Sequence, residues 1–228
     1  MKEQADLLSQ GPRIKVFVGE FGSGKTELAV NYALQLRQQG YKTAIVDIDI
    51  VKPYFRTREN RRLLEDAGVT VVAPEGRLAH TDLPVMPHDL TRVLYQEDCQ
   101  VVMDVGGGES AIVLGQLNRK FAENPYQALL VVNTRRPFTS TAPAIVDACR
   151  RISGVSRLKV TGLVSNTNLA AETTPQLILD GLAITEAAAA ELGLPVNWVV
   201  VPHWLAGQVS VPYPVFVLKP YTQYPWME

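Results

Sequence analysis

The chain has 228 residues, of which 46% are apolar and 20% are charged, and its formal net charge is −1 at pH 7. The length suits one large α/β domain, and the composition excludes a largely disordered or fibrous chain. The near-zero charge gives no overall electrostatic reason to bind nucleic acid or an anionic membrane. We therefore expect a single domain over residues 1–228.

Two further features bear on the cellular compartment. Cys99 and Cys149 are the only cysteines and form no C-x-x-C or C-x-C pair, so the sequence specifies neither a disulfide framework nor a local zinc or iron–sulfur site. Residues 1–13 are polar, and no later apolar run approaches the ~20 residues that cross a bilayer. These features predict a cytoplasmic protein without a membrane segment.

The strongest chemical signal lies near the N-terminus. Residues 14–18 are a β-branched and aromatic run that predicts a strand, and residues 27–39 have an apolar stripe at helical spacing that ends at Gly40. The segment between them fits the phosphate-binding pattern G-x-x-x-x-G-K-[ST] at every required position. It is Gly19-Glu20-Phe21-Gly22-Ser23-Gly24-Lys25-Thr26.

The chemistry of this loop follows from its residue types. Glycines let the backbone curl so that successive N–H groups point into one concavity, and the following helix adds the partial positive charge of its N-terminus. Lys25 is predicted to contact the β- and γ-phosphates, and the Thr26 hydroxyl to complete the shell of a magnesium ion. The sequence therefore predicts a site for a magnesium-bound nucleoside triphosphate.

The next predicted strand, residues 42–46, leads into two acidic residues. Asp47 and Asp49 point the same way if the segment is extended, and both follow the strand at the edge where open parallel sheets bind ligands. One carboxylate can hold magnesium, while the other orients water or accepts the proton of a substrate hydroxyl. The alternative is that one of the pair caps the next segment.

A run of cations follows these aspartates between Lys52 and Arg62, on a loop and a predicted helix over residues 57–67. Such a run is often a solvated helix face. Its place beside the predicted γ-phosphate also suits an anionic small molecule or an acidic partner protein. Both interpretations stay open.

A second acidic strand end completes the predicted magnesium site. After a strand at 69–73, an irregular stretch and a short helix at 87–96, the buried strand 100–104 ends at Asp104. This carboxylate is predicted to support magnesium opposite Thr26. Gly107 either donates its N–H to the γ-phosphate or is a plain turn glycine.

The remaining pattern defines the fold class. Strands are predicted at 128–132, 158–164 and 196–201, with helices at 141–151 and 174–192 between them. This alternation predicts a three-layer, doubly wound α/β fold with a mainly parallel sheet, the P-loop NTPase fold. From about residue 205 prolines predict an irregular tail containing one edge strand at 215–218.

Several motifs together resemble one group of P-loop NTPases. The phosphate loop, Val46–Asp49, Asp104–Gly107 and Gly162–Asn166 resemble the MinD/ParA and cobyrinic acid synthetase-like group over residues 13–204. The resemblance implies that Asp49 assists the attacking water, that Asp104 supports magnesium, that Asn166 contacts adenine and that Pro202 lines the base. The segment 133–137 follows a strand and is a second candidate to approach the nucleotide or substrate. Because the N-K-x-D guanine signature is absent from the sequence, ATP is favoured over GTP.

The predicted site thus has three sets of residues. The catalytic set is Lys25 and Asp49, and the metal set is Thr26, Asp47 and Asp104. The nucleotide-binding set is Gly19, Glu20, Phe21, Gly22, Ser23, Gly24, Lys25, Thr26, Glu27, Gly107, Asn166 and Pro202.

Departures from the group limit the function. Glu20 stands where dimeric switch ATPases have a lysine that reaches the partner's phosphates, and because an acid cannot replace that lysine, the sequence argues against a nucleotide-sandwich dimer. A monomer or a homodimer is expected. The C-terminus carries neither the amphipathic membrane helix of MinD-type proteins nor the C-x-x-C of iron–sulfur carriers. We expect slow hydrolysis of Mg-ATP as a conformational switch. The alternatives are an ATP-dependent kinase or ligase resembling dethiobiotin synthetase, and a non-catalytic regulator or metalloenzyme chaperone that docks a partner through its Tyr- and Trp-containing tail.

Overall fold

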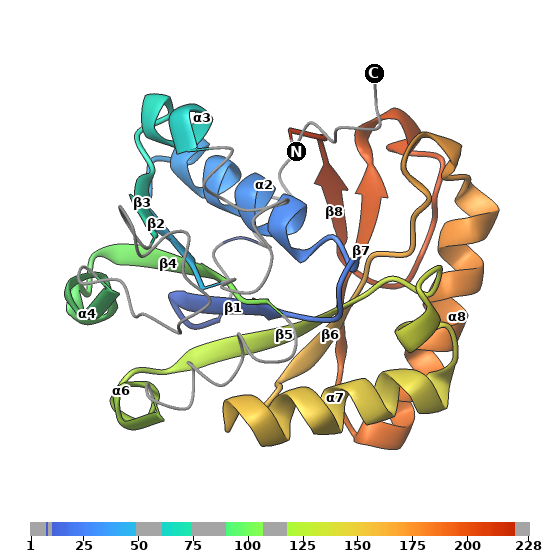
Figure 1. Ribbon diagram of the computed structural model, residues 1–228. Coiled ribbons are helices and arrows are strands. Elements are labelled where there is room, and N and C mark those ends of the chain that lie inside the picture. The colour runs from blue at the N-terminus through green and yellow to red at the C-terminus, as the bar shows by residue number, and fades with distance from the viewer. Residues whose placement is uncertain (1–7, 9–10, 49–60, 74–89, 107–117, 222–228) are drawn as a thin grey trace.

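The computed structural model describes residues 8, 11–48, 61–73, 90–106 and 118–221. Within these residues eight strands form one sheet in the order β3-β2-β4-β1-β5-β6-β7-β8, and each neighbouring pair runs parallel (Figure 1). The strands are β1 (Ile14–Val18), β2 (Lys42–Asp47), β3 (Thr70–Val72), β4 (Cys99–Asp104), β5 (Tyr126–Val132), β6 (Gly162–Ser165), β7 (Val196–Pro202) and β8 (Val215–Leu218).

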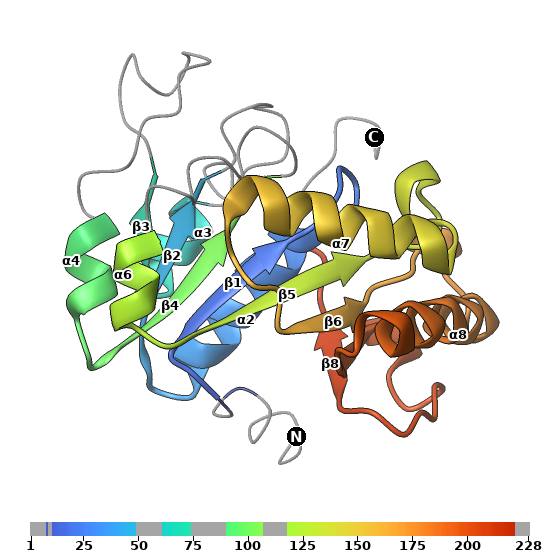
Figure 2. The same cartoon turned by 90° about the horizontal axis from the view of Figure 1, so that it is seen from below.

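Helices cover both faces of this sheet. They are α2 (Lys25–Gln38), α3 (Arg61–Asp66), α4 (Leu90–Tyr95), α6 (Asn118–Glu123), α7 (Ala142–Ser156) and α8 (Pro175–Leu192), with short 3₁₀ turns η3 (Pro137–Thr139), η4 (Ala170–Glu172) and η5 (His203–Leu205). Figure 2 shows α4, α6, α7 and α8 in front of the sheet, with α2 and α3 behind it. The predicted three-layer α/β fold is confirmed.

The core consists of two apolar clusters, one on each side of the sheet. Alternate residues of a strand point to opposite faces, so Val16 of β1 packs with α7 and α8, whereas Phe17 packs with α2. On the α2 side, Tyr32 stacks on Trp198 with ring centroids 5.4 Å apart. Parallel strands covered on both faces explain the nearly continuous apolar runs of the sequence.

The strand order reverses at β1. The chain builds β2, β3 and β4 on one side of β1 and then β5 to β8 on the other. In open parallel sheets such a reversal leaves a crevice at the carboxyl ends of the strands, where ligands bind. The phosphate loop leaves β1 at this point.

Some element boundaries differ from the predictions. Leu158 and Val160 are buried, but β6 begins only at Gly162. Their apolar side chains pack in the core although their backbone is not part of the strand, so burial alone made the predicted strand too long. Helix α7 continues beyond the predicted end at residue 151 and stops at Ser156, before Arg157, which has a left-handed backbone. The pattern did not indicate α6, which has only six residues.

Among the described residues, the structure contains no helix with the length and apolarity that crossing a membrane requires.

Two helical glycines have opposite surroundings and provide a matched test of the packing. A Cβ added to Gly181 in α8 would lie within 2.1–2.6 Å of the Thr167 side chain, whereas one added to Gly154 in α7 meets nothing within 4 Å. We expect Gly181→Ala to lower the free energy of unfolding by about 1–3 kcal/mol through overpacking. Gly154→Ala should leave it unchanged or raise it by up to about 1 kcal/mol. Urea unfolding of both variants measures the difference, and equal midpoints would contradict the close packing of α8 on Thr167.

Candidate functional site

The phosphate loop has the tight backbone that its glycines predict. Gly22 and Gly24 have positive φ angles of 75° and 83°, which favour glycine. A Cβ on Gly19 would lie 2.7 Å from the carbonyl oxygen of Val131 and 2.8 Å from Ser23 Oγ. The loop therefore forms a narrow cradle that only an unsubstituted backbone can make at these positions.

Helix α2 begins directly after this cradle. Its N-cap residue, Gly24, provides no side-chain hydrogen bond, so the positive end of the helix is not capped by a side chain. Ser23 Oγ is buried without a hydrogen-bond partner among the described residues. Lys25, only 6% exposed, and half-buried Thr26 occupy the first turn. These features fit a polyphosphate, whose oxygens accept hydrogen bonds from backbone N–H groups and from a serine hydroxyl.

Two buried carboxylates lie beside the cradle. Asp47 and Asp104 end the neighbouring strands β2 and β4, are partners in the sheet register, and are each 0% exposed. Strand alternation puts them on the same face as Ile45 and Val102, the face that α2 covers. The topology thus brings both aspartates and the first turn of α2 to one edge of the sheet.

This arrangement suits magnesium better than a metal held by protein ligands alone. Within the described part of the chain, no three His, Cys, Asp or Glu side chains lie close enough to hold a metal. Magnesium usually takes one or two carboxylates and completes its shell with waters and substrate phosphates. Thr26, Asp47 and Asp104 are therefore the described residues that would hold it.

The side chains of Glu20 and Phe21, two residues of the phosphate loop, make contacts other than with the phosphate cradle. The Glu20 carboxylate forms an ion pair of 2.7 Å with Arg151 on α7, and Phe21 is 58% exposed. On the outside of the loop, Arg136 Nε donates to the Gly22 carbonyl oxygen over 3.1 Å. These contacts brace the loop from the α7 side.

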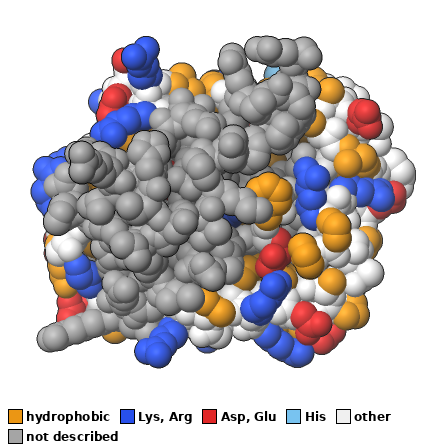
Figure 3. All heavy atoms as spheres, viewed as in Figure 1, with side chains coloured by type: hydrophobic (Ala, Val, Ile, Leu, Met, Phe, Trp, Pro, Cys, Tyr) orange, Lys and Arg blue, Asp and Glu red, His pale blue; other side chains and the backbone are white. Residues whose placement is uncertain are grey.

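In the described part of the face in Figure 3, basic and acidic side chains lie interspersed with apolar ones.

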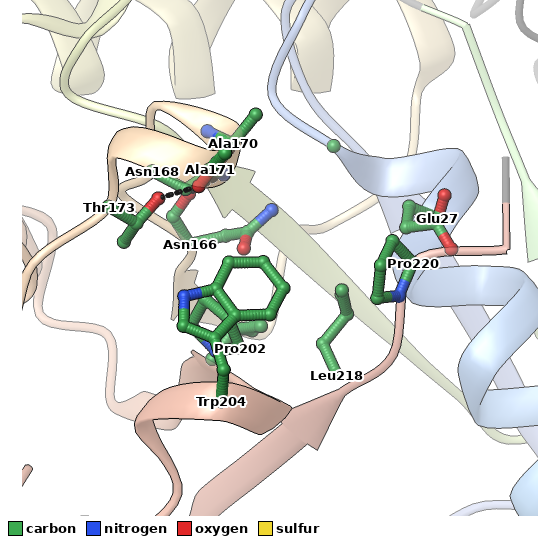
Figure 4. A pocket seen from close by; sticks show the side chains of 12 residues that line it. Glu27, Asn166, Asn168, Ala170, Ala171, Thr173, Pro202, Trp204, Leu218 and Pro220 are labelled. Carbon is green, nitrogen blue, oxygen red and sulfur yellow. Dashed lines mark hydrogen bonds between the residues drawn. The ribbon is translucent and has the colours of Figure 1, made fainter. Parts of the chain in front are cut away.

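A cavity of about 460 Å³ opens next to the phosphate loop (Figure 4). Asn166 and Asn168 line it from the loop after β6, Pro202 and Trp204 from the end of β7, and Glu27 from α2. Apolar groups form most of its wall, and a few polar groups converge on it, as is usual in small-molecule sites. The cavity has the character expected of a site for a nucleotide base.

Asn166 links this cavity to the phosphate loop. Its Nδ2 donates to the Ser23 carbonyl oxygen over 2.7 Å, and a Cβ on Gly24 would lie 2.4 Å from the same nitrogen. The side-chain oxygen points toward Trp204 in Figure 4. Asn166 therefore both supports the loop and presents an acceptor to the cavity.

Sequence reasoning missed several residues of this region. Trp204, Asn168 and Leu218 line the cavity, but they belong to no recognised motif. Asn133 was noted only as part of the segment 133–137. Its fully buried side chain accepts from the Asn168 N–H over 3.3 Å and donates to the Asn168 carbonyl oxygen over 3.2 Å, joining the loops after β5 and β6. The sequence signal that could have identified Asn133 is its position directly after a buried strand, at the edge of the sheet where ligands bind.

Some predicted residues lie outside the described ones. These are Asp49, Gly107 and most of the cationic run, residues 52–60. Arg61, at the end of that run, pairs with Glu65 of α3 over 2.8 Å.

Comparisons with known proteins support the fold and leave the narrower group open. No family model matches the sequence, and a search of curated proteins finds no significant match. Several solved structures of FtsY, a P-loop NTPase, are similar in fold. FtsY from Mycoplasma mycoides matches with a TM-score of 0.56 and 18% identity, over 84% of this chain and 61% of that one.

Two further structures give similar values. The signal recognition particle receptor FtsY from Elizabethkingia anophelis has a TM-score of 0.54 and 18% identity, over 87% of this chain and 64% of that one. FtsY from Thermotoga maritima has a TM-score of 0.52 and 19% identity, over 87% and 68%. This chain thus matches less than two thirds of the first two proteins. The fold is that of P-loop NTPases, and the resemblance to the MinD/ParA group stays a prediction.

The buried carboxylates generate a test of the metal site. We expect Asp104→Asn to weaken magnesium-dependent nucleotide affinity by about tenfold to a hundredfold, because a neutral amide replaces a buried charge beside the cradle. Titration of nucleotide with and without magnesium measures the effect. Asp98→Asn is the control, since Asp98 is exposed and pairs with Lys42, over 3.0 Å, away from the phosphate loop at the opposite end of β2. Equal magnesium dependence in both variants would contradict the assignment.

Proposed function

We propose that this protein binds Mg-ATP at the phosphate loop and hydrolyses it slowly, using the γ-phosphate as a conformational switch. The observation that carries the proposal is the meeting of a glycine-rich loop, a helix N-terminus and two buried, in-register carboxylates where the strand order reverses. This combination neutralises and positions a polyphosphate, which is most of what phosphoryl transfer requires of a protein.

The described residues divide the work as follows. Lys25 offsets the charge of the β- and γ-phosphates, and the backbone of the loop donates to their oxygens. Thr26, Asp47 and Asp104 would hold magnesium, which neutralises charge on the phosphates when bound. On this proposal Asp49 orients the attacking water, as the sequence resemblance implies.

Adenine is the proposed base, and guanine is the second candidate. Asn166 offers a side-chain oxygen to the cavity, which can accept from the amino group of either purine. The preference for adenine rests on the absence of the N-K-x-D guanine signature from the sequence. Asn168 has its amide engaged, since Nδ2 donates to the Asn166 carbonyl oxygen over 2.8 Å and Oδ1 accepts from the Ala170 N–H over 3.4 Å. Guanine is favoured by one similar structure, FtsY from Elizabethkingia anophelis in complex with GDP.

The proposed oligomeric state is a self-sufficient monomer. Glu20 occupies the position of the lysine that would serve a partner's phosphates, and its carboxylate pairs with Arg151 of the same chain. An acidic side chain at this position would repel the phosphates of a second nucleotide.

Loss of the Lys25 ammonium tests whether the phosphate loop carries the turnover. We expect Lys25→Ala to lower the rate of phosphate release from Mg-ATP by about a hundredfold to a thousandfold, because a preorganised charge at the phosphates is lost. Lys42→Ala is the control, since Lys42 is an exposed lysine at the amino end of β2, opposite the strand end that carries Asp47. The wild-type rate per molecule should stay constant as protein concentration rises. A rate that Lys25→Ala leaves unaltered refutes the site, and a rate that climbs with concentration refutes the monomer.

A competition between nucleotides tests which base the cavity binds. ATP should displace a fluorescent nucleotide at lower concentration than GTP does, and the reverse order would make guanine the ligand. Trp204→Ala should weaken nucleotide binding by about fivefold to a hundredfold, because an aromatic wall that can stack on the base is lost. Trp204→Phe, which keeps an aromatic ring, should recover most of that affinity. Equal affinities for wild type and Trp204→Ala would exclude Trp204 from the base site.

A further inference from the structure

Residues 217–221, the end of β8 and the three residues that follow it, are bound to α2 by a set of side chains that we call the α2 ladder. These are Glu27, Asn31 and Gln35. Gln35 Nε2 donates to the Val217 carbonyl oxygen over 3.2 Å. Asn31 accepts from the Lys219 N–H over 2.9 Å and donates to the Lys219 carbonyl oxygen over 2.8 Å. Glu27 Oε1 accepts from the Tyr221 N–H over 2.7 Å.

The spacing of the ladder matches the spacing of the segment. Residues four apart lie on one face of a helix and rise by about 6 Å. Alternate residues of an extended chain advance by about 6.6 Å. The segment 217–221 therefore runs antiparallel to α2, and Tyr221 meets the first turn of the helix, directly after the phosphate loop.

Two of the three ladder side chains, Asn31 and Glu27, are buried, and Gln35 is half-buried. Asn31 is 1% exposed and Glu27 is 7% exposed. Asn31 Nδ2 also lies 2.8 Å from the Glu27 carbonyl oxygen and 3.1 Å from Glu27 Oε1, so its two hydrogens are shared between Glu27 and the Lys219 carbonyl oxygen. A buried polar atom that loses its partner is strongly unfavourable. Release of the segment would break the hydrogen bonds that Asn31 and Glu27 make to Lys219 and Tyr221.

The same segment forms one wall of the cavity beside the phosphate loop. Leu218 and Pro220 line this cavity together with Glu27, and they lie across from Asn166 and Trp204 (Figure 4). The side of the cavity nearest α2 is thus complete only while the segment is docked on the ladder.

We infer that residues 217–221 are the closing wall of the base site, and that docking of this segment on the α2 ladder and binding of a purine base strengthen each other. The inference rests on the proposed function, because that proposal identifies the occupant of the cavity as a base. Coupling of this kind is reciprocal: whatever strengthens docking raises base affinity, and a bound base strengthens docking. Asn31 is then a positioning residue, since it does not line the cavity.

The test separates the base from the phosphates by comparing ATP with inorganic tripolyphosphate. Wild type should bind ATP more tightly than tripolyphosphate. Asn31→Ala should lose about tenfold of ATP affinity, because two hydrogen bonds to Lys219 disappear, and should keep its affinity for tripolyphosphate. Gln38→Ala, an exposed change on the same helix, should alter neither affinity.

A second measurement uses the unmodified protein, in case Asn31→Ala does not fold. Hydrogen exchange at the amides of Lys219 and Tyr221 should slow with ATP and stay unchanged with tripolyphosphate. Equal slowing by both ligands, or a folded Asn31→Ala that keeps its preference for ATP, would overturn the inference and leave the phosphate site standing. Wild type that binds tripolyphosphate as tightly as ATP would also overturn it. Wild type that binds neither ligand would refute the proposed function itself.

Discussion

The close approach of the phosphate loop to its neighbours is the constraint on which the site depends. At Gly19, Gly22 and Gly24 a single added carbon would lie 2.8 Å or less from an atom of another loop or of the strand β5. The atoms belong to Val131 in β5, to Arg136 in the loop after β5, and to Asn166 directly after β6. The loop therefore keeps its curl because the sheet positions three neighbours around it, and its glycines are the residues that fit between them.

Electrostatics adds a second constraint at the same edge. Asp47 and Asp104 are fully buried side by side at the ends of β2 and β4, and burying charge in a protein is costly unless it is compensated. The positive end of α2 and the Lys25 ammonium lie at this edge and compensate for such charge, and the proposed magnesium ion would add to them. The stability of the folded state and the chemistry of the site thus both require positive charge beside Asp47 and Asp104.

Helix α2 has two functions that lie on different parts of its surface. Its first turn faces the phosphate cradle, and its buried polar ladder holds the backbone of the last described residues. Glu27 belongs to both regions, because it lines the cavity and accepts from the Tyr221 N–H.

Local pattern by itself determined the strand–loop–helix unit at residues 14–39 and the α/β class, because phosphate loops need fixed residue types at fixed spacing and sheets need apolar strands. It also located Asp47 and Asp104 at strand ends. Only the tertiary structure decided that these carboxylates are neighbours in register, that Glu20 pairs with Arg151, and that residues 217–221 close the cavity. Those contacts join residues 57, 131 and 194 positions apart, such as Glu27 and Tyr221, and no local periodicity encodes them. They depend on which strands become neighbours, and that is settled by packing of the whole sheet.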